Sequence, residues 1–237
     1  MNIIEYKECY ASEHQRELLK EIFKFLLKSS IYLTGDTCLS VFYLNHRKSK
    51  DIDIFFTKKI DLLKFVSFFR KFQTEIIIES SRFCSYMSKN IKLNFVYESS
   101  RLLSKLKIIK IDDTFIRLDT LENITINKIK AIATRYDVKD LFDLGILFSN
   151  YFTENEFIKF YKKAMKKEDN LKDFLYITGV FKTAIEAIKN NKKELLLKED
   201  NNFDQTLEKL SKTFNKLIES LIKINFNLYK HNNNLKI

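Results

Sequence analysis

The pattern of hydrophobic and polar residues changes about halfway along the chain, near residue 120. Before that point, short apolar runs typical of strands alternate with amphipathic stretches typical of helices. The helical stretches cover residues 14–28, 37–44 and 62–72, and the strand-like runs are IYLTGDT (31–37), DIDIFF (51–56), TEIIIESS (74–81), IKLNFVYE (91–98), LKIIKIDD (106–113) and FIRLDT (115–120). Asp36 or Thr37 is expected to cap the second helix. This mixture predicts an α/β or α+β domain in residues 1–120.

From Leu121 onward the apolar residues follow the helical period of about 3.6 residues. Four helical stretches cover residues 122–136, 137–152, 154–167 and 173–191, and Asp137 would cap the second of them. A last helix repeats apolar residues in a 3-4 alternation between Leu207 and Leu228. That seam fits either a coiled-coil dimer or a bundle within one chain, and we expect the bundle because other helices precede it. The sequence predicts an all-α helical bundle in residues 121–237.

The composition and net charge of the chain indicate a candidate class of binding partner. The 237 residues are 45% hydrophobic, which is enough for a real core. The formal net charge of +11 favours a polyanionic partner, although a solvated lysine-rich surface would have the same charge. On the stretch 154–167, Lys162 and Lys166 form a like-charged i,i+4 pair, as do Lys163 and Lys167. Such pairs cost little on a helix, and a phosphate backbone would make them favourable.

Three further features of the sequence bear on the cellular compartment of the protein. The three cysteines lack metal-ligand spacing and are expected to be reduced thiols. No stretch approaches the roughly 20 uncharged apolar residues of a membrane span. The first residues show no signal-peptide pattern. The sequence therefore predicts a soluble cytoplasmic protein without a membrane partner.

Two carboxylates stand one residue apart in the strand-like run DIDIFF. Because side chains alternate along a strand, Asp51 and Asp53 would share one face while Ile52 and Ile54 share the other. Carboxylate oxygens with open positions for water and phosphate suit Mg²⁺. Phosphoryl and nucleotidyl transfer need such a site, because the metal neutralises the triphosphate and the developing charge. A D-x-D pair in a surface loop is the competing interpretation.

Gly35 stands at an expected strand-to-helix turn in TGDT. A glycine there lets backbone N–H groups approach a phosphate, and the following helix N-terminus favours negative charge. Glycine is also ordinary in turns. By itself this position is therefore weak evidence for a nucleotide site.

The longer stretch YLTGDTCLSVFYLNHRKSKDIDIFF (32–56) resembles the first motif of the AbiEii/AbiGii toxin-type nucleotidyltransferases, which belong to the DNA polymerase beta-like superfamily. The family pattern, roughly G-G-T-A-L followed by H-R-x-S-x-D-x-D, is matched by Gly35, Thr37, Leu39, His46, Arg47, Ser49, Asp51 and Asp53. This composite is far more specific than the D-x-D pair alone. The resemblance implies a nucleotidyltransferase-like mixed-sheet domain with helices. It also implies that Asp51 and Asp53 are catalytic metal ligands, and that Gly35, Thr37, Arg47 and Ser49 bind the nucleotide.

A second block, NKIKAIATRYDVKDLFDL (127–144), is similar to the family's K-L-x-A-I-x-x-R-x-x-x-K-D-F-x-D-L. Lys128 and Arg135 are seven residues apart and share one helical face, while Asp140 and Asp143 share a face of the next helix. These charges could simply form salt bridges that lock two helices together. The resemblance implies more: Lys128 and Asp140 are catalytic, and Arg135 contacts the nucleotide. Weaker similarity extends the resemblance to roughly residues 15–190.

Two positions depart from the family pattern. Asp36 stands where the family has a small residue, and its charge would repel a triphosphate unless the side chain caps the helix or turns away. Asn94 stands where superfamily enzymes commonly carry a third metal-side carboxylate. An asparagine offers one neutral oxygen, so it would be a weak metal ligand and no general base. Asp140 or Asp143 would then have to serve as the base.

The resemblance suggests a metal-dependent transfer of NMP from an NTP to an acceptor such as tRNA, with a toxin-antitoxin or phage-defence role. The expected cofactor is Mg²⁺, with Mn²⁺ as an alternative, and the expected partners are the NTP, the RNA acceptor and a cognate antitoxin. One alternative is a degenerate nucleotidyltransferase fold that only binds nucleic acid, which Asp36 and Asn94 would explain. Another is a phosphotransferase that phosphorylates its own Ser49. The sequence does not specify the nucleotide, the acceptor or the oligomeric state.

Overall fold

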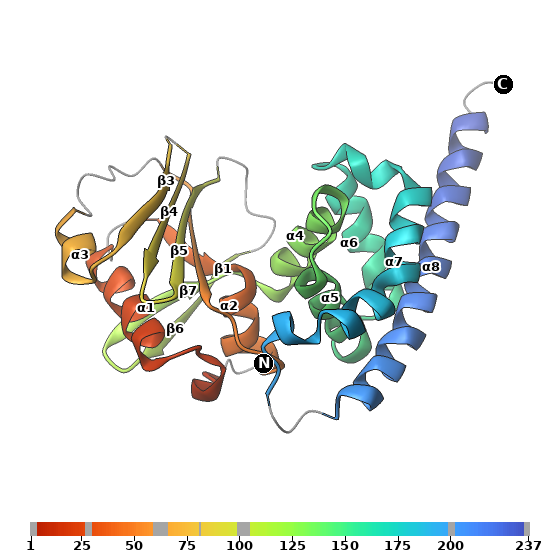
Figure 1. Ribbon diagram of the computed structural model, residues 1–237. Coiled ribbons are helices and arrows are strands. Elements are labelled where there is room, and N and C mark those ends of the chain that lie inside the picture. The colour runs from red at the N-terminus through yellow and green to blue at the C-terminus, as the bar shows by residue number, and fades with distance from the viewer. Residues whose placement is uncertain are drawn as a thin grey trace. The chain divides into compact units, whose positions relative to one another are not determined.

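A computed structural model of the chain describes residues 4–26, 30–58, 66–80, 82–98, 105–198 and 202–234. The chain forms two compact units, Met1–Ile124 and Thr125–Ile237 (Figure 1). The first unit contains a mixed sheet with helices, and the second is all-helical, as the sequence predicts. The boundary between them falls within helix α4 (Leu121–Thr134).

The described part of the first unit holds a mixed sheet of seven strands in the order β3-β4-β5-β2-β1-β7-β6. The strands are β1 (Ile31–Thr34), β2 (Asp51–Phe56), β3 (Glu75–Glu79), β4 (Phe83–Ser88), β5 (Ile91–Tyr97), β6 (Lys107–Ile111) and β7 (Thr114–Leu118). Strand β2 pairs antiparallel with β1 and parallel with β5, so the D-x-D strand lies at the centre of the sheet. The sequence pattern missed β4, because FCSYMS does not alternate and its pairing with β3 and β5 decides its conformation.

The helices of the first unit include α1 (Glu13–Phe25), α2 (Gly35–Leu39) and α3 (Val66–Lys71). Ser12 is the N-cap of helix α1, and its side chain accepts from the backbone N–H of Gln15. The helix packs against β7. The parts of the predicted helices at residues 27–28 and 62–65 lie outside the described residues. A π-helical turn, Ser40–Leu44, follows α2 and completes the stretch predicted at 37–44.

The predicted cap of the second helix is wrong. Helix α2 begins at Gly35, its N-cap is Thr34, and this cap makes no side-chain hydrogen bond. The side chains of Asp36 and Thr37 are used elsewhere: Asp36 pairs with Arg47, and the Thr37 hydroxyl donates to the backbone carbonyl of Asp51. Tertiary partners therefore outcompeted the local capping bond.

The second unit contains α4 and the helices α5 (Val138–Asn150), α6 (Glu154–Met165), α7 (Phe174–Asn190) and α8 (Phe203–Asn234), with short 3₁₀ turns at Asp169–Lys172 and Lys192–Leu195. Asp137 caps α5 as predicted, since its side chain accepts from the backbone N–H of Lys139. Thr153 and Glu156 form a capping box at the start of α6. No helix in the described residues combines the length and apolarity that a bilayer crossing requires.

Helix α8 completes the core of the second unit. Its apolar seam is buried against α5, α6 and α7, and the buried residues are Leu207, Leu210, Phe214, Leu217, Leu221 and Ile224. A Cβ on Gly145 of α5 would lie 2.7 Å from Leu210 Cδ2, so α5 and α8 approach closely because this residue is glycine. Helices α7 and α8 run side by side (Figure 1). The expected bundle within one chain is confirmed.

Truncating the buried seam of α8 should destabilise the helical unit. Phe214 is 2% exposed and its ring packs 5.6 Å from that of Phe181. We expect Phe214→Ala to lower the free energy of unfolding by about 3–5 kcal/mol, because it removes a buried ring and leaves a cavity. Phe226 lies on the same helix and is 56% exposed, so Phe226→Ala should change stability by less than about 0.5 kcal/mol. Urea unfolding followed by circular dichroism measures both, and equal effects would contradict the assignment of the core.

Candidate active site

The two aspartates of the D-x-D motif lie on one face of the central strand β2. Ile52 and Ile54 are fully buried, whereas Asp51 and Asp53 are half-buried. The predicted alternation along this strand is confirmed. Both carboxylates therefore project from the same side of the sheet.

A row of polar side chains crosses four neighbouring strands at the level of Asp53. Thr34 of β1 and Asn94 of β5 pair with Asp53 from either side, and Ser85 of β4 pairs with Asn94. Directly paired residues lie on the same face of a sheet, so these side chains can contact one another. Asn94 Nδ2 donates to Asp53 Oδ1 at 2.9 Å, and Ser85 Oγ donates to Asn94 Oδ1 at 2.9 Å.

The amide of Asn94 acts as a hydrogen-bond donor to Asp53. An ionised carboxylate can only accept hydrogen bonds, so the nitrogen of the amide must face Asp53 and the oxygen must face Ser85. The sequence predicts Asn94 as a weak metal ligand. In the observed arrangement its oxygen faces Ser85, and a ligand role would require the amide to turn over.

Gly35 lies directly against the Asp53 carboxylate. Its φ is +70°, and a Cβ at this position would lie 2.1 Å from Asp53 Oδ2 and 2.9 Å from Asp53 Cγ. Both the left-handed backbone and the missing side chain are therefore required. The predicted strand-to-helix turn is confirmed, and the contact with Asp53 is a further reason for glycine at this position.

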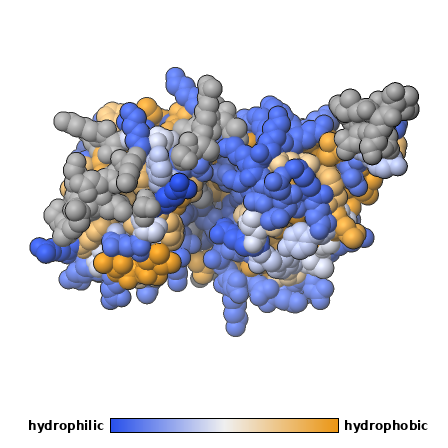
Figure 2. Space-filling model, turned by 90° about the horizontal axis from the view of Figure 1, so that it is seen from above, coloured by the Kyte–Doolittle hydropathy of each residue, from blue (hydrophilic) through white to orange (hydrophobic). Residues whose placement is uncertain are grey.

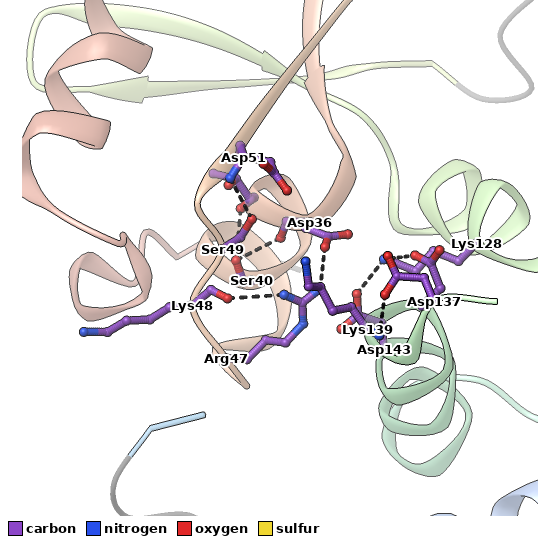
Figure 3. Close-up of polar contacts among 12 residues, drawn as sticks. Asp36, Ser40, Arg47, Lys48, Ser49, Asp51, Lys128, Asp137, Lys139 and Asp143 are labelled. Carbon is purple, nitrogen blue, oxygen red and sulfur yellow. Dashed lines mark hydrogen bonds and ion pairs between the residues drawn. The ribbon is translucent and has the colours of Figure 1, made fainter. Parts of the chain in front are cut away.

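Arg47 neutralises Asp36. Arg47 Nη2 lies 2.6 Å from Asp36 Oδ2, and the Arg47 side chain is only 2% exposed (Figure 3). Arg47 Nη1 also donates to the backbone carbonyl of Lys48 at 3.2 Å. The charge of Asp36, which departs from the family pattern, is thus compensated within the same unit. The predicted contact of Arg47 with a nucleotide stays a prediction.

Thr37 and Ser49 both bind the backbone of Asp51. The buried Thr37 hydroxyl donates to the Asp51 carbonyl. Ser49 Oγ accepts from the Asp51 N–H at 3.3 Å (Figure 3). Ser49 is 3% exposed, which counts against its use as a nucleophile in this conformation. Two side chains predicted to bind phosphates therefore hold the start of β2. The sequence analysis missed a third buried group at this point, Gln15, a polar residue on the apolar face of α1.

The sequence analysis also missed Asp119, which follows β7. Its Oδ2 accepts from Thr34 Oγ1 at 2.8 Å, and its Oδ1 accepts from Thr120 N at 2.8 Å and from Asn123 Nδ2 at 2.7 Å. Burial raises the pKa of the Asp119 carboxyl, and these hydrogen bonds oppose the rise. Asp119 thus extends the polar row beyond Thr34. In the sequence, Asp119 could have been recognised as a carboxylate at the end of the apolar run FIRLD.

A buried charge cluster joins α4 and α5 of the second unit. Lys128 Nζ lies 2.8 Å from Asp140 Oδ1 and 2.6 Å from Asp143 Oδ2, and Arg135 Nε donates to Asp140 Oδ2 at 2.9 Å (Figure 3 labels Lys128 and Asp143). The side chains of Lys128, Asp140 and Asp143 are at most 5% exposed, while that of Arg135 is 63% exposed. The four formal charges sum to zero, which makes burial tolerable. The predicted sharing of faces is confirmed, and the salt bridges of the structural interpretation are present.

Two solved structures from Helicobacter pylori share this fold, and a third structure is similar at a lower score. JHP933 from Helicobacter pylori has 23% sequence identity and a TM-score of 0.57, with 94% of this chain and 99% of that chain covered. A second crystal structure of an H. pylori protein has 22% identity and a TM-score of 0.53, with coverage of 92% and 98%. MenT4, a nucleotidyltransferase toxin from Mycobacterium tuberculosis, has 11% identity and a TM-score of 0.47, with coverage of 85% and 81%. No curated protein matches the chain.

The mixed sheet with its central D-x-D strand and the family match together place the chain among the nucleotidyltransferases. The family described as "Nucleotidyl transferase AbiEii toxin, Type IV TA system" matches residues 17–226. The chain therefore belongs to the AbiEii nucleotidyltransferase toxin family, and the resemblance inferred from its motifs is confirmed.

The raised pKa of Asp119 predicts a pH-dependent contribution to stability. Because the folded chain holds this proton more tightly than the unfolded chain, Asp119 favours folding at low pH, and the contribution is lost as the pH rises through the raised pKa. We expect the unfolding free energy of wild type, relative to Asp119→Asn, to increase when the pH falls from about 7 to about 4. Urea unfolding at each pH measures this difference. A constant or shrinking difference would show that the pKa is not raised.

Proposed function

We propose that the protein transfers a nucleoside monophosphate from an NTP to an RNA acceptor, such as the 3′ end of a tRNA. The observation that carries this proposal is the geometry of Asp53. Its carboxylate lies against the glycine turn of Gly35, receives a hydrogen bond from Asn94 and shares a strand face with Asp51. Membership in a nucleotidyltransferase toxin family supports the reaction class.

Asp51 and Asp53 would hold Mg²⁺, or Mn²⁺ in its place. Two half-buried carboxylates on one strand face offer hard oxygen ligands, and this donor set fits either ion. When bound, the ion neutralises the triphosphate and the charge that develops on the leaving oxygen. Asn94 orients one Asp53 oxygen, while Thr37 and Ser49 fix the backbone of Asp51. The protein thus orders both ligand-bearing residues before the nucleotide binds.

We propose that the turn at Gly35 presents its backbone to the nucleotide phosphates, with Thr37, Arg47 and Ser49 forming the wall of that site. In the helical unit, Lys128 would neutralise the nucleotide and Arg135 would contact it, as the family resemblance implies. Asp140 accepts hydrogen bonds from both Lys128 and Arg135. This geometry favours a supporting role for Asp140, which holds the two cations in place.

Helix α6 is our candidate surface for the RNA acceptor. Lys162 is exposed and Lys163 is half-exposed in the last turn of this helix, and the exposed Lys166 and Lys167 directly follow its end at Met165. Figure 2 shows hydrophilic surface over much of the helical unit, on the right in that view. A phosphate backbone along α6 would relieve the repulsion of the like-charged pairs and release counterions. The net charge of +11 supports the same class of partner.

We further propose a toxin role with a cognate antitoxin, which the name of the family supports. Transfer of a nucleotide to tRNA would block its use in translation and arrest growth, which also suits defence against phage.

Incubation with labelled NTPs, Mg²⁺ and total RNA tests the reaction. We expect wild type to label RNA, EDTA to abolish labelling, and Asp51→Asn to lose at least about 100-fold of the rate, because loss of an outer-shell partner alone typically costs 10–100-fold. Asp204→Asn, which changes an exposed aspartate of α8, should behave like wild type. RNA binding without label transfer from any NTP would support the binding-module alternative and refute the proposal.

Gly35→Ala should impair transfer. The new Cβ would overlap Asp53 Oδ2 and would require a left-handed backbone that alanine disfavours. Displacement of a ligand by about 1 Å can cost about 100-fold in rate, so we expect a loss of that order. Gly179→Ala is the matched control, because a Cβ there meets no atom within 4 Å. Labelled-NTP assays compare the two variants, and equal activity would contradict the proposed role of the turn.

A further inference from the structure

We propose that Gln15 is a positioning residue of the active site, whose side-chain amide fixes the backbone of the metal-binding Asp51. This inference rests on the proposed nucleotidyltransferase function. Gln15 lies outside both motifs that carry the family resemblance and just before residues 17–226, the region that the family matches, so neither assigns it a role. Its position follows from the contacts of the first unit alone.

Gln15 is fully buried, and both the nitrogen and the oxygen of its side-chain amide form hydrogen bonds. Nε2 donates to the Ser49 carbonyl at 2.8 Å and to Thr37 Oγ1 at 3.2 Å, while Oε1 accepts from the Ala11 N–H at 2.7 Å. Two donors and one acceptor are thus satisfied inside the unit. On α1 this residue occupies the face that otherwise buries Leu18, Leu19 and Ile22. A polar residue on that face costs desolvation unless its hydrogen bonds compensate, and here they do.

The two residues that Gln15 contacts, Thr37 and Ser49, both hydrogen-bond the backbone of Asp51 through their side chains. Thr37 donates its own proton to the Asp51 carbonyl, and Ser49 Oγ accepts from the Asp51 N–H. Gln15 therefore connects the two residues whose side chains hydrogen-bond the C=O and the N–H of Asp51. Loss of its amide would remove one hydrogen bond from the Thr37 hydroxyl and one from the Ser49 carbonyl at once.

The sheet itself leaves the backbone of Asp51 in need of such partners. The pairing of β1 with β2 ends at Thr34 and Asp53, two residues before Asp51 is reached. Alternate residues of a strand direct their N–H and C=O groups to the same neighbour, so Asp51 faces the side on which β1 has already ended. The side chains of Thr37 in α2 and Ser49 before β2 hydrogen-bond this backbone in place of the strand, and Gln15 of α1 contacts both residues.

The segment preceding α1 reinforces this arrangement. Tyr10 forms an isolated parallel bridge with Ser49, and the Tyr6 N–H donates to the Val41 carbonyl at 2.8 Å. Because Gln15 Oε1 accepts from Ala11 N–H, the same amide also holds this segment. Gln15 is thus the point where residues before α1, helix α2 and the start of β2 are connected.

The full chain with Gln15→Leu and Gln15→Met tests the inference, with Gln205→Leu, an exposed glutamine of α8, as the control. Both apolar variants suit the buried face of α1 and remove the amide. We expect the Kd for Mn²⁺, measured by calorimetry, to rise about tenfold and kcat to fall about 10–100-fold, the usual cost of losing a group that orients a metal ligand. The KM for the NTP at saturating Mg²⁺ should stay within about twofold of wild type, and excess Mg²⁺ should restore part of kcat.

Hydrogen exchange of the Asp51 amide provides a readout that needs neither metal nor nucleotide. We expect faster exchange at Asp51 in both apolar variants, with unchanged exchange in the core of β5. A wild type that transfers no nucleotide refutes the proposed function, and the positioning role fails with it. An active wild type whose apolar variants keep its Mn²⁺ affinity, kcat and Asp51 exchange refutes the Gln15 inference alone. Unfolding of both apolar variants would make Gln15 a folding determinant and would also overturn its positioning role.

Discussion

The contact between the Asp53 carboxylate and the backbone of Gly35 is the constraint on which the site depends. It requires a residue without a side chain at the end of β1, a left-handed turn into α2, and a β2 strand in register with β1. Asn94 fixes the same carboxylate from β5 by donating to it. Asp53 is therefore held from both neighbouring strands, and a central strand of a mixed sheet can supply that geometry where an isolated loop cannot.

Buried charged side chains in both units are paired with opposite charges. In the first unit, Arg47 neutralises Asp36 beside the glycine turn, so the residue that departs from the family pattern does not leave an uncompensated charge there. In the helical unit, Lys128 and Arg135 are balanced by Asp140 and Asp143. Buried charges are tolerated only when they are paired and hydrogen-bonded, and removal of one partner is costly. Mutation of one residue of such a pair would therefore leave the charge of its partner buried and uncompensated.

Hydrogen bonds to backbone groups and between side chains organise the residues around the D-x-D strand. Thr37 and Ser49 hold Asp51, Gln15 links them, and Asp119 holds Thr34 beside Asp53. These hydrogen-bonding residues determine how precisely the two carboxylates are positioned, because a side chain cannot be held more rigidly than the backbone to which it is attached. Ser85 has the same effect on Asn94.

The sequence by itself determined the local features, and the tertiary structure decided which partners the side chains chose. The alternation of DIDIFF, the helical periods after Leu121 and the glycine turn depend on neighbouring residues, so their patterns are visible in the chain. The strand β4, the pairing of Asp36 with Arg47, and the donor role of Asn94 depend on residues distant in sequence. Gln15 and Asp119 were missed for the same reason. A buried polar side chain acquires its role from the groups that surround it, and only folding brings those groups together.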